Sequence, residues 1–334
     1  MTTLIYTHSA CLGHRPGTHH PESPERLLAV LEALKTPEFA DVQWRNAPLG
    51  MREHVLLVHA PEYVESVEAL SSTEGLRTLD AGDTVMSPGT LEAVMRCVGA
   101  ACAAVDAVVG RDARNAFCAT RPCGHHAEAD RAMGFCVLNQ AAIAALHACE
   151  AHGLKRVAVV DFDVHHGNGT QNASFRNPDL FYGSCHQSPF YPGTGARHET
   201  GVAIVNVPLS RNCDSATFRA RMAADMLPAL RRFGAELIII SAGFDAHHMD
   251  PLGGLNFTDD DYHWITRELM KVADESASGR VVSSKVVTAS KRWPPARRRI
   301  SERSWADSRS AHLFADMRLA AIRGCARANP IAGF

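Results

Sequence analysis

Two short runs of aliphatic residues, each followed by a polar segment, constrain the fold of this chain most. The runs are 156–161 and 236–241, and they read RVAVVD and ELIIIS. Continuous apolar runs of this length are typical of strands buried on both faces, as in a parallel sheet. Ligands of open α/β sheets bind at the carboxyl ends of the strands. We therefore expect the segments after both runs, 161–169 and 241–247, to contribute to one site.

The rest of the chain alternates between strand-like and helix-like segments. Expected strands are 3–7, 115–119, 156–161, 179–183, 203–207, 236–241 and 279–283. Expected helices are 24–35, 89–109, 138–151, 215–233 and 259–273, with Thr258 as the N-cap of the last. This alternation predicts a single α/β domain with a mostly parallel central sheet and helices on both faces. No linker rich in Gly, Ser or Pro precedes residue 276.

The segments after the two strands carry residues that bind metals. In extended chain, residues i and i+2 point the same way, so Asp163 and His165 can face one point, and Asp245 follows the other strand. Two carboxylates and one imidazole suit Zn²⁺ or Fe²⁺ with positions left open. A third segment adds the pair His125 and His126. A lone Asp after a strand is usually a turn or cap residue, but three such segments together favour a metal site.

These and other segments resemble the histone deacetylase superfamily, which includes acetylpolyamine amidohydrolases and shares its fold with arginases. The resemblance rests on the segments 20–26 (HPESPER), 83–84 (DT), 124–126 (GHH), 134–136 (GFC), 161–169, 192–195 (PGTG) and 245–254. It covers residues 1–283, and residues 284–334 form a tail that does not match. The opening segment, Asn168 and the segment 251–254 resemble the class II branch and its bacterial relatives.

The resemblance implies roles for the metal and acid–base residues. Asp163, His165 and Asp245 would hold one Zn²⁺ per chain. His126 would be the general base for the attacking water, and His125 the electrostatic partner or proton donor near the leaving amine. Asp161 would accept a hydrogen bond from His125 and favour its charged form, whereas Asn168 would orient His126 without adding charge.

The resemblance also implies a substrate tunnel and a second ion. Gly134, Phe135, Tyr191 and Leu252 would line a narrow tunnel for an acyl-lysine-like chain, and Asp83 at its rim would accept a substrate N–H. A structural K⁺ beside the zinc would use Ser184 and the backbone carbonyls of Asp161, Asp163, His165 and Cys185.

Comparison with the arginase pattern favours a single catalytic metal. Arginases bind two metals with Asp-x-His-x-Asp and Asp-x-Asp segments. Here the additional carboxylate positions hold Gly167 and His247. The distinctive ligands of the second metal are therefore missing.

Composition limits the partners and the compartment. The net charge is −2, and no basic stripe over the body suggests direct contact with nucleic acid. Ten cysteines without a Cys-x-x-Cys pair suit reduced thiols in a cytoplasm. The first twelve residues do not resemble a signal peptide, and no apolar run is long enough for a membrane span. We expect a cytoplasmic protein that acts on an acetylated lysine peptide or an acetylated polyamine. A homo-oligomer is possible.

One departure from the family bears directly on activity. In the family, a strand like 279–283 is followed by Leu-Glu-Gly-Gly-Tyr, and this tyrosine donates a hydrogen bond to the developing oxyanion. None of the five tyrosines lies there, nor does a histidine replace it. Two functions stay open: a zinc-dependent deacetylase, or a catalytically impaired relative that only binds acylated amines.

The tail itself suggests why the tyrosine is missing. If Ser283 to Thr288 are encoded TCC TCG AAG GTG GTT ACG, reading from the last base of the first codon gives Leu-Glu-Gly-Gly-Tyr. Permissible codons for Ala289 to Trp305 continue in that frame without a stop and encode a helix-favouring, proline-free segment. The tail as written carries paired prolines and a basic run, which is typical of a partly disordered segment. We therefore interpret the tail as a frameshift or reading-frame artefact.

Overall fold

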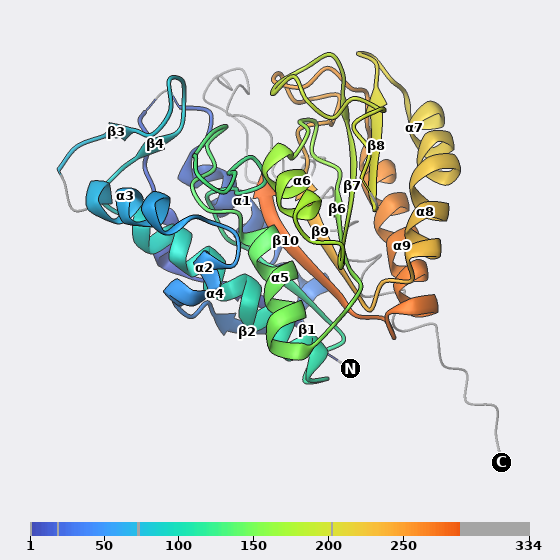
Figure 1. Cartoon of the computed structure of the whole chain (residues 1–334), viewed down its shortest axis with the longest axis horizontal. Coiled ribbons are helices and arrows are strands. Elements are labelled where there is room, and N and C mark those ends of the chain that lie inside the picture. Colours follow the sequence, from blue (N-terminus) through green and yellow to red (C-terminus); the bar gives the residue numbers. More distant parts are fainter. Residues whose placement is uncertain (1, 19, 72–73, 202, 288–334) are drawn as a thin grey trace.

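A computed structural model describes residues 2–18, 20–71, 74–201 and 203–287, without the side chains of 284–287 (Figure 1). Its centre is an eight-stranded parallel sheet with strand order β2-β1-β5-β10-β9-β6-β7-β8. The strands are β1 (Thr3–Thr7), β2 (Gln43–Asn46), β5 (Asn115–Cys118), β6 (Val157–Asp161), β7 (Leu180–Gln187), β8 (Ile204–Leu209), β9 (Leu237–Gly243) and β10 (Val281–Val287). Strands β3 (Arg77–Thr78) and β4 (Val85–Met86) form a separate antiparallel pair. The expected α/β fold with a mostly parallel sheet is confirmed.

Helices cover both faces of the sheet, as expected (Figure 1). They are α1 (Pro24–Ala33), α2 (Arg52–Leu56), α3 (Pro61–Ser71), α4 (Thr90–Val109), α5 (Gln140–His152), α6 (Asn168–Phe175), α7 (Ser215–Arg221), α8 (Leu227–Phe233) and α9 (Asp259–Ser276). Short helical turns are η1 (Ser9–Leu12), η2 (Pro37–Phe39) and η3 (Met222–Met226). Thr258 caps α9 through a capping box with Asp261.

The apolar strands explain why two helical layers form. Along β6, Val157 and Val159 pack into the core on the side of α4 and α5, while Ala158 and Val160 pack on the side of α1, α8 and α9. Side chains alternate across a strand, so a fully apolar strand supplies core to both faces. The central strands are thereby fixed, and their carboxyl ends meet along one edge.

Several elements differ from the expectation. The expected helix 215–233 is α7, a π-helical turn η3 and α8 in succession, because Pro228 lacks the N–H that a regular helix ladder needs there. The sequence analysis missed β2, whose four residues are all exposed, and α6, which is built mostly from small and polar residues. Strand β10 continues to Val287, past the expected end at residue 283.

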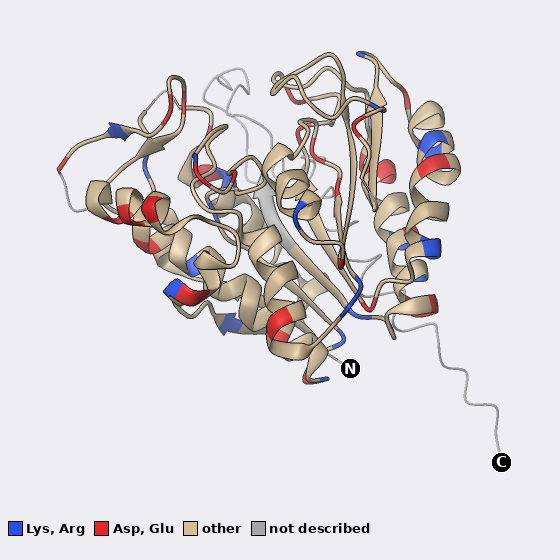
Figure 2. Ribbon diagram, in the orientation of Figure 1, with Lys and Arg blue, Asp and Glu red and all other residues tan. Residues whose placement is uncertain are grey.

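Other features of the described residues bear on the remaining expectations. Figure 2 shows Lys and Arg interspersed with Asp and Glu along the outer helices. The nine cysteines in the described ranges are all free. Among the described residues, no helix is long and apolar enough to cross a membrane. Residues 288–334, which carry most of the tail and of the frameshift interpretation, lie outside the described residues.

Candidate active site

The loops after β6 and β9 bring three expected metal ligands together. The ligand atoms of Asp163, His165 and Asp245 all lie within 4.8 Å of one another. Nδ1 of His165 is 3.0 Å from Oδ1 of Asp163 and 3.2 Å from Oδ2 of Asp245. Both carboxylates are buried, whereas one fifth of the His165 side chain is exposed. The neighbouring strands β6 and β9 thus place the three donors at one point, with access from outside.

The electrostatics of this cluster favour a bound cation. Burial alone would lower the pKa of His165, but the hydrogen bonds and charges of Asp163 and Asp245 outweigh it and raise the pKa to about 10. The two buried carboxylates therefore favour positive charge at this point. One nitrogen and two oxygen donors in this setting fit a divalent ion such as Zn²⁺.

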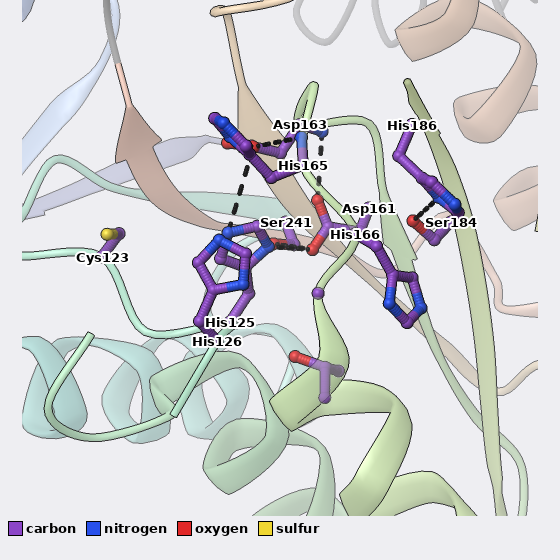
Figure 3. Close-up of polar contacts among 12 residues, drawn as sticks. Cys123, His125, His126, Asp161, Asp163, His165, His166, Ser184, His186 and Ser241 are labelled. Carbon is purple, nitrogen blue, oxygen red and sulfur yellow. Dashed lines mark hydrogen bonds and ion pairs between the residues drawn. The ribbon is translucent and has the colours of Figure 1, made fainter. Parts of the chain in front are cut away.

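The two histidines of the segment 124–126 lie beside Asp163 and His165 of the cluster (Figure 3), and they have different partners. Nδ1 of His125 is 2.8 Å from a carboxylate oxygen of Asp161. Nδ1 of His126 is 2.9 Å from the side-chain oxygen of Asn168. The rings are 3.9 Å apart between centroids, and both are buried. One imidazole thus faces a carboxylate and the other a neutral amide.

Each of these partners is itself held in place. The hydroxyl of Ser241, at the carboxyl end of β9, donates to Oδ2 of Asp161 over 2.9 Å. The amide nitrogen of Asn168 donates to a carboxylate oxygen of Glu128 over 2.6 Å. His126 is therefore linked to the Glu128 carboxylate indirectly, through two hydrogen bonds of the Asn168 side-chain amide. Such supporting hydrogen bonds fix the orientation and the tautomer of the imidazoles.

Two of the expected wall residues, Gly134 and Tyr191, lie against the His126 ring. Gly134 has φ +56°, and a Cβ there would lie 2.5 Å from the His126 ring and 3.0 Å from the Tyr191 hydroxyl oxygen. Only glycine allows the chain to approach so closely. The ring of Tyr191 meets that of His126 edge to face, with centroids 5.2 Å apart. The backbone N–H of Phe135 donates to the hydroxyl of Thr84.

Two residues expected at the outer end of the tunnel, Asp83 and Leu252, lie at the protein surface. Asp83 is exposed, and its carbonyl is 2.7 Å from Nε2 of His20. Burial and the neighbouring Asp80 raise the pKa of the Asp83 carboxyl. Leu252 is 38% exposed, and its N–H donates to Asp250. Both residues therefore have the exposure that a rim requires.

Three of the expected K⁺ ligands are adjacent through the pairing of β6 with β7. Asp161 pairs with Ser184 in the register of β6 and β7, and Cys185 follows on β7. All three are buried. The hydroxyl of Ser184 also lies 2.9 Å from Nδ1 of His186, a neighbour that the sequence analysis did not assign (Figure 3).

The positions that would hold a second arginase-like metal are used differently. A Cβ at Gly167 would lie 2.7 Å from Oδ2 of Asp161 and 2.7 Å from the Tyr182 hydroxyl oxygen, so a carboxylate side chain does not fit there. Nε2 of His247 lies 3.2 Å from Asp259. Neither position therefore supplies the carboxylate that a second, arginase-like metal would need.

Besides His186, three residues near the site had no assigned role in the sequence analysis. Phe190 stacks on the His165 ring at 5.1 Å between centroids, Ser241 supports Asp161, and Glu128 supports Asn168. The position of Ser241 at a strand end signalled a site residue. Glu128 and Phe190 lie in loops, where no strand register predicts contacts.

The comparisons with known proteins agree with this geometry. The histone deacetylase domain family matches residues 20–285. Histone deacetylase 14, chloroplastic, of Arabidopsis thaliana is 37% identical over 300 residues, which cover 84% of this chain and 71% of the relative. The histone deacetylase-like amidohydrolase of Pseudomonas aeruginosa is 36% identical over 306 residues, covering 84% and 80%.

A solved structure is similar over nearly the whole chain. The crystal structure of the HDA15 HD domain superposes with a TM-score of 0.84 at 28% sequence identity, covering 99% of this chain and 91% of that chain. The expected resemblance is confirmed at the level of sequence and of fold. The chain belongs to the histone deacetylase family.

Proposed function

We propose that this chain is a zinc-dependent amidohydrolase that removes acetyl groups from lysine side chains or from polyamines. The observation that carries the proposal is the convergence of Asp163, His165 and Asp245 beside a buried histidine pair. Among enzymes, this combination suits hydrolysis of an amide by activated water. The expected division at residue 283 between a hydrolase domain and a tail is part of the same proposal.

The metal would supply Lewis acidity to the amide carbonyl and lower the pKa of water. Two histidines of the chain would transfer the protons. His126, oriented by Asn168, would accept the proton from the attacking water. His125, facing the carboxylate of Asp161, would carry positive charge and donate a proton to the leaving amine. Fe²⁺ fits the same donors.

The walls would select a slim, extended substrate. Gly134 and Phe135 on one side and Tyr191 on the other would hold the aliphatic chain of an acetylated amine, with Leu252 completing the wall. Asp83 at the rim would accept an N–H of the substrate. A K⁺ held by Ser184 and the backbone carbonyls of Asp161, Asp163, His165 and Cys185 would stabilise the loop beneath the zinc.

One sequence fact favours a second candidate function. In this alternative, the chain binds acylated amines but hydrolyses them only slowly. No tyrosine follows Tyr262. Loss of one oxyanion donor typically lowers the rate by about 10²–10³. If the tail is the product of a shifted frame, both functions apply: the ancestral frame encodes the deacetylase, and this chain is its impaired form.

An assay with two substrates and two chains tests the proposal. The chain as written and a chain that carries the alternative reading after Ser283 are each supplied with an acetyl-lysine peptide and an acetylated polyamine. We expect at least about 10²-fold faster hydrolysis in the restored chain, and no hydrolysis when Asp245→Ala is added to it. No hydrolysis by either chain would contradict the enzyme, and full activity in the chain as written would contradict the frameshift. Sequencing the gene across the codons for residues 280–290 tests the frameshift directly.

A further inference from the structure

A second group of potential metal ligands lies on helices α4 and α5, away from the strand ends. Asp106 lies in the last turn of α4, and His147 and His152 lie in the C-terminal half of α5. Nε2 of His147 and Nε2 of His152 lie 2.7 and 2.8 Å from the same oxygen, Oδ1 of Asp106. The two rings are nearly perpendicular, with 5.8 Å between centroids. Three donor atoms from two helices therefore converge on one point.

This group is separate from the catalytic cluster. The N-cap of α5, Asn139, donates a hydrogen bond to the carbonyl of Ala127, which follows His126 directly. His147 lies about 12 Å farther along the helix axis than Asn139, at about 1.5 Å per residue. The two sets of donors cannot share an ion.

The local charge favours a cation at this point. The C-terminal end of a helix carries partial negative charge, so an acidic side chain in the last turn of α4 is unfavourably placed without a positive partner. Burial opposes ionisation of Asp106, but the hydrogen bonds from His152 and His147 outweigh it and lower the pKa of its carboxyl. The side chain of Asp106 is 52% exposed, which leaves the group open to ions from solvent.

A competing set of donors shares His147. Ligand atoms of His54, Cys102 and His147 also lie within 4.8 Å of one another. Cys102 is buried, and burial raises the pKa of its thiol to about 12. Because the thiolate is the form that binds metals, this set is the weaker one. Asp106 and His152 are also more accessible than the buried Cys102.

We propose that Asp106, His147 and His152 form a peripheral binding site for one divalent cation of the Zn²⁺ class, which joins the C-terminal turns of α4 and α5. Two imidazoles and one carboxylate suit Zn²⁺, Co²⁺ or Ni²⁺ better than Mg²⁺ or Ca²⁺. Tetrahedral coordination at about 2.0–2.1 Å places donors about 3.4 Å apart. The distances from the two histidine nitrogens to Asp106 would therefore have to lengthen by less than about 1 Å. The exposed carboxylate of Asp106 has the freedom to move that far. A fourth position would face water.

Equilibrium dialysis of the full chain with Zn²⁺ tests the site. Mild dialysis first leaves the ion at the catalytic cluster, and Zn²⁺ is then added back. We expect a second equivalent in the unmodified chain. Asp106→Asn and His152→Gln should each lower the affinity for this second Zn²⁺ by more than the roughly 10–100-fold that loss of an outer-shell partner costs. The first equivalent should be retained in both variants. Both residues are partly exposed, so the variants are expected to fold, and circular dichroism checks this.

Two matched controls identify the donors. Asp112→Asn removes a similar exposed charge three residues beyond α4, and Cys102→Ala removes the competing thiol; both should keep the second equivalent. Co²⁺ in place of added Zn²⁺ should show no thiolate-to-metal absorption. No second equivalent in the unmodified chain, or an unchanged one in both Asp106→Asn and His152→Gln, would overturn the proposal. A second equivalent that disappears in Cys102→Ala would overturn the choice of donors.

Discussion

The strand-end cluster and the helix cluster use similar residues in opposite settings. At the strand ends, Asp163 and Asp245 are 1–2% exposed, and each accepts hydrogen bonds from backbone N–H groups or from His165. On the helices, the side chain of Asp106 is half exposed, and its carboxylate accepts hydrogen bonds from the side chains of two histidines. Rigid backbone orders the first set, and side-chain packing between helices orders the second.

This difference predicts different affinities. Donors that are buried and preorganised lose little freedom on binding, and they exchange solvent for a fixed polar environment. Donors on exposed side chains must be ordered by the ion itself. The expectation of one tightly held ion per chain therefore applies to the strand-end cluster, and the helix cluster should release its ion first.

The largest expected effect on metal binding is the loss of the tightly held ion. Asp245→Ala removes a buried ligand and should lower retention of Zn²⁺ by more than about 100-fold, because the remaining donors no longer balance the charge of the ion. Metal content after mild dialysis measures this. Asp260→Ala, an exposed residue of α9, is the matched control and should retain one equivalent. Unchanged retention in Asp245→Ala, or two equivalents that resist dialysis in the unmodified chain, would contradict the contrast between the clusters.

The next effect separates the two roles around His126. In the restored chain, His126→Ala should lower kcat by about 10²–10⁴, since it deletes the base. Asn168→Ala should cost about 10–100-fold, because it only frees the orientation of the base. Steady-state rates at saturating substrate, with metal content and circular dichroism verified, measure both. Equal losses, or an active His126→Ala enzyme, would overturn the assignment.

The contrast between the clusters also explains what could be predicted from the sequence. The pattern 156–165 places Asp163 and His165 at a strand end by periodicity alone, and the geometry confirms that they meet. The contact of Asp106 with His147 depends on how α4 rotates against α5, and no short-range pattern encodes that rotation. The same limit applies to Glu128, whose contact with Asn168 joins a loop to the first residue of α6. Strand β2 was missed because its exposed residues lack apolar alternation.

A third effect concerns stability, and it tests how firmly the loop that carries His125 and His126 is anchored. Arg121 is 1% exposed; its guanidinium donates to both carboxylate oxygens of Glu22 and to the carbonyls of Cys11 and His14. Burial would raise the pKa of Glu22, but His14 and Arg121 outweigh it and lower the pKa to about 2. Compared with the ordinary carboxyl pKa of 4.5, this shift contributes about 3 kcal/mol to the free energy of unfolding at neutral pH.

Glu22→Gln should therefore lower the free energy of unfolding at pH 7 by about 3 kcal/mol. The folded pKa is depressed, so the stabilisation is complete above about pH 4.5 and is lost as the pH falls toward 2. The difference between the unmodified chain and the variant should shrink across that window in urea titrations. Glu38→Gln, at an exposed position, is the control and should change little. A difference that is independent of pH would mean that packing, and not charge, holds the loop.

The smallest effect is expected at Asp106 itself when no metal is present. In excess chelator, Asp106→Asn should lower the free energy of unfolding by at most about 1 kcal/mol, because exposed ion pairs contribute little. The pKa of this carboxyl is lowered, so even this contribution is present at neutral pH and is lost as the pH falls through the acid range. Urea titrations of the unmodified chain and the variant, each with chelator and with Zn²⁺ added back, measure it. Zn²⁺ should then widen the difference between the two, since an ion that binds only the folded state stabilises it. A loss as large as that of Glu22→Gln in chelator would mean that the helix cluster is a structural ion pair in its own right, and the contrast with the strand-end cluster would no longer hold.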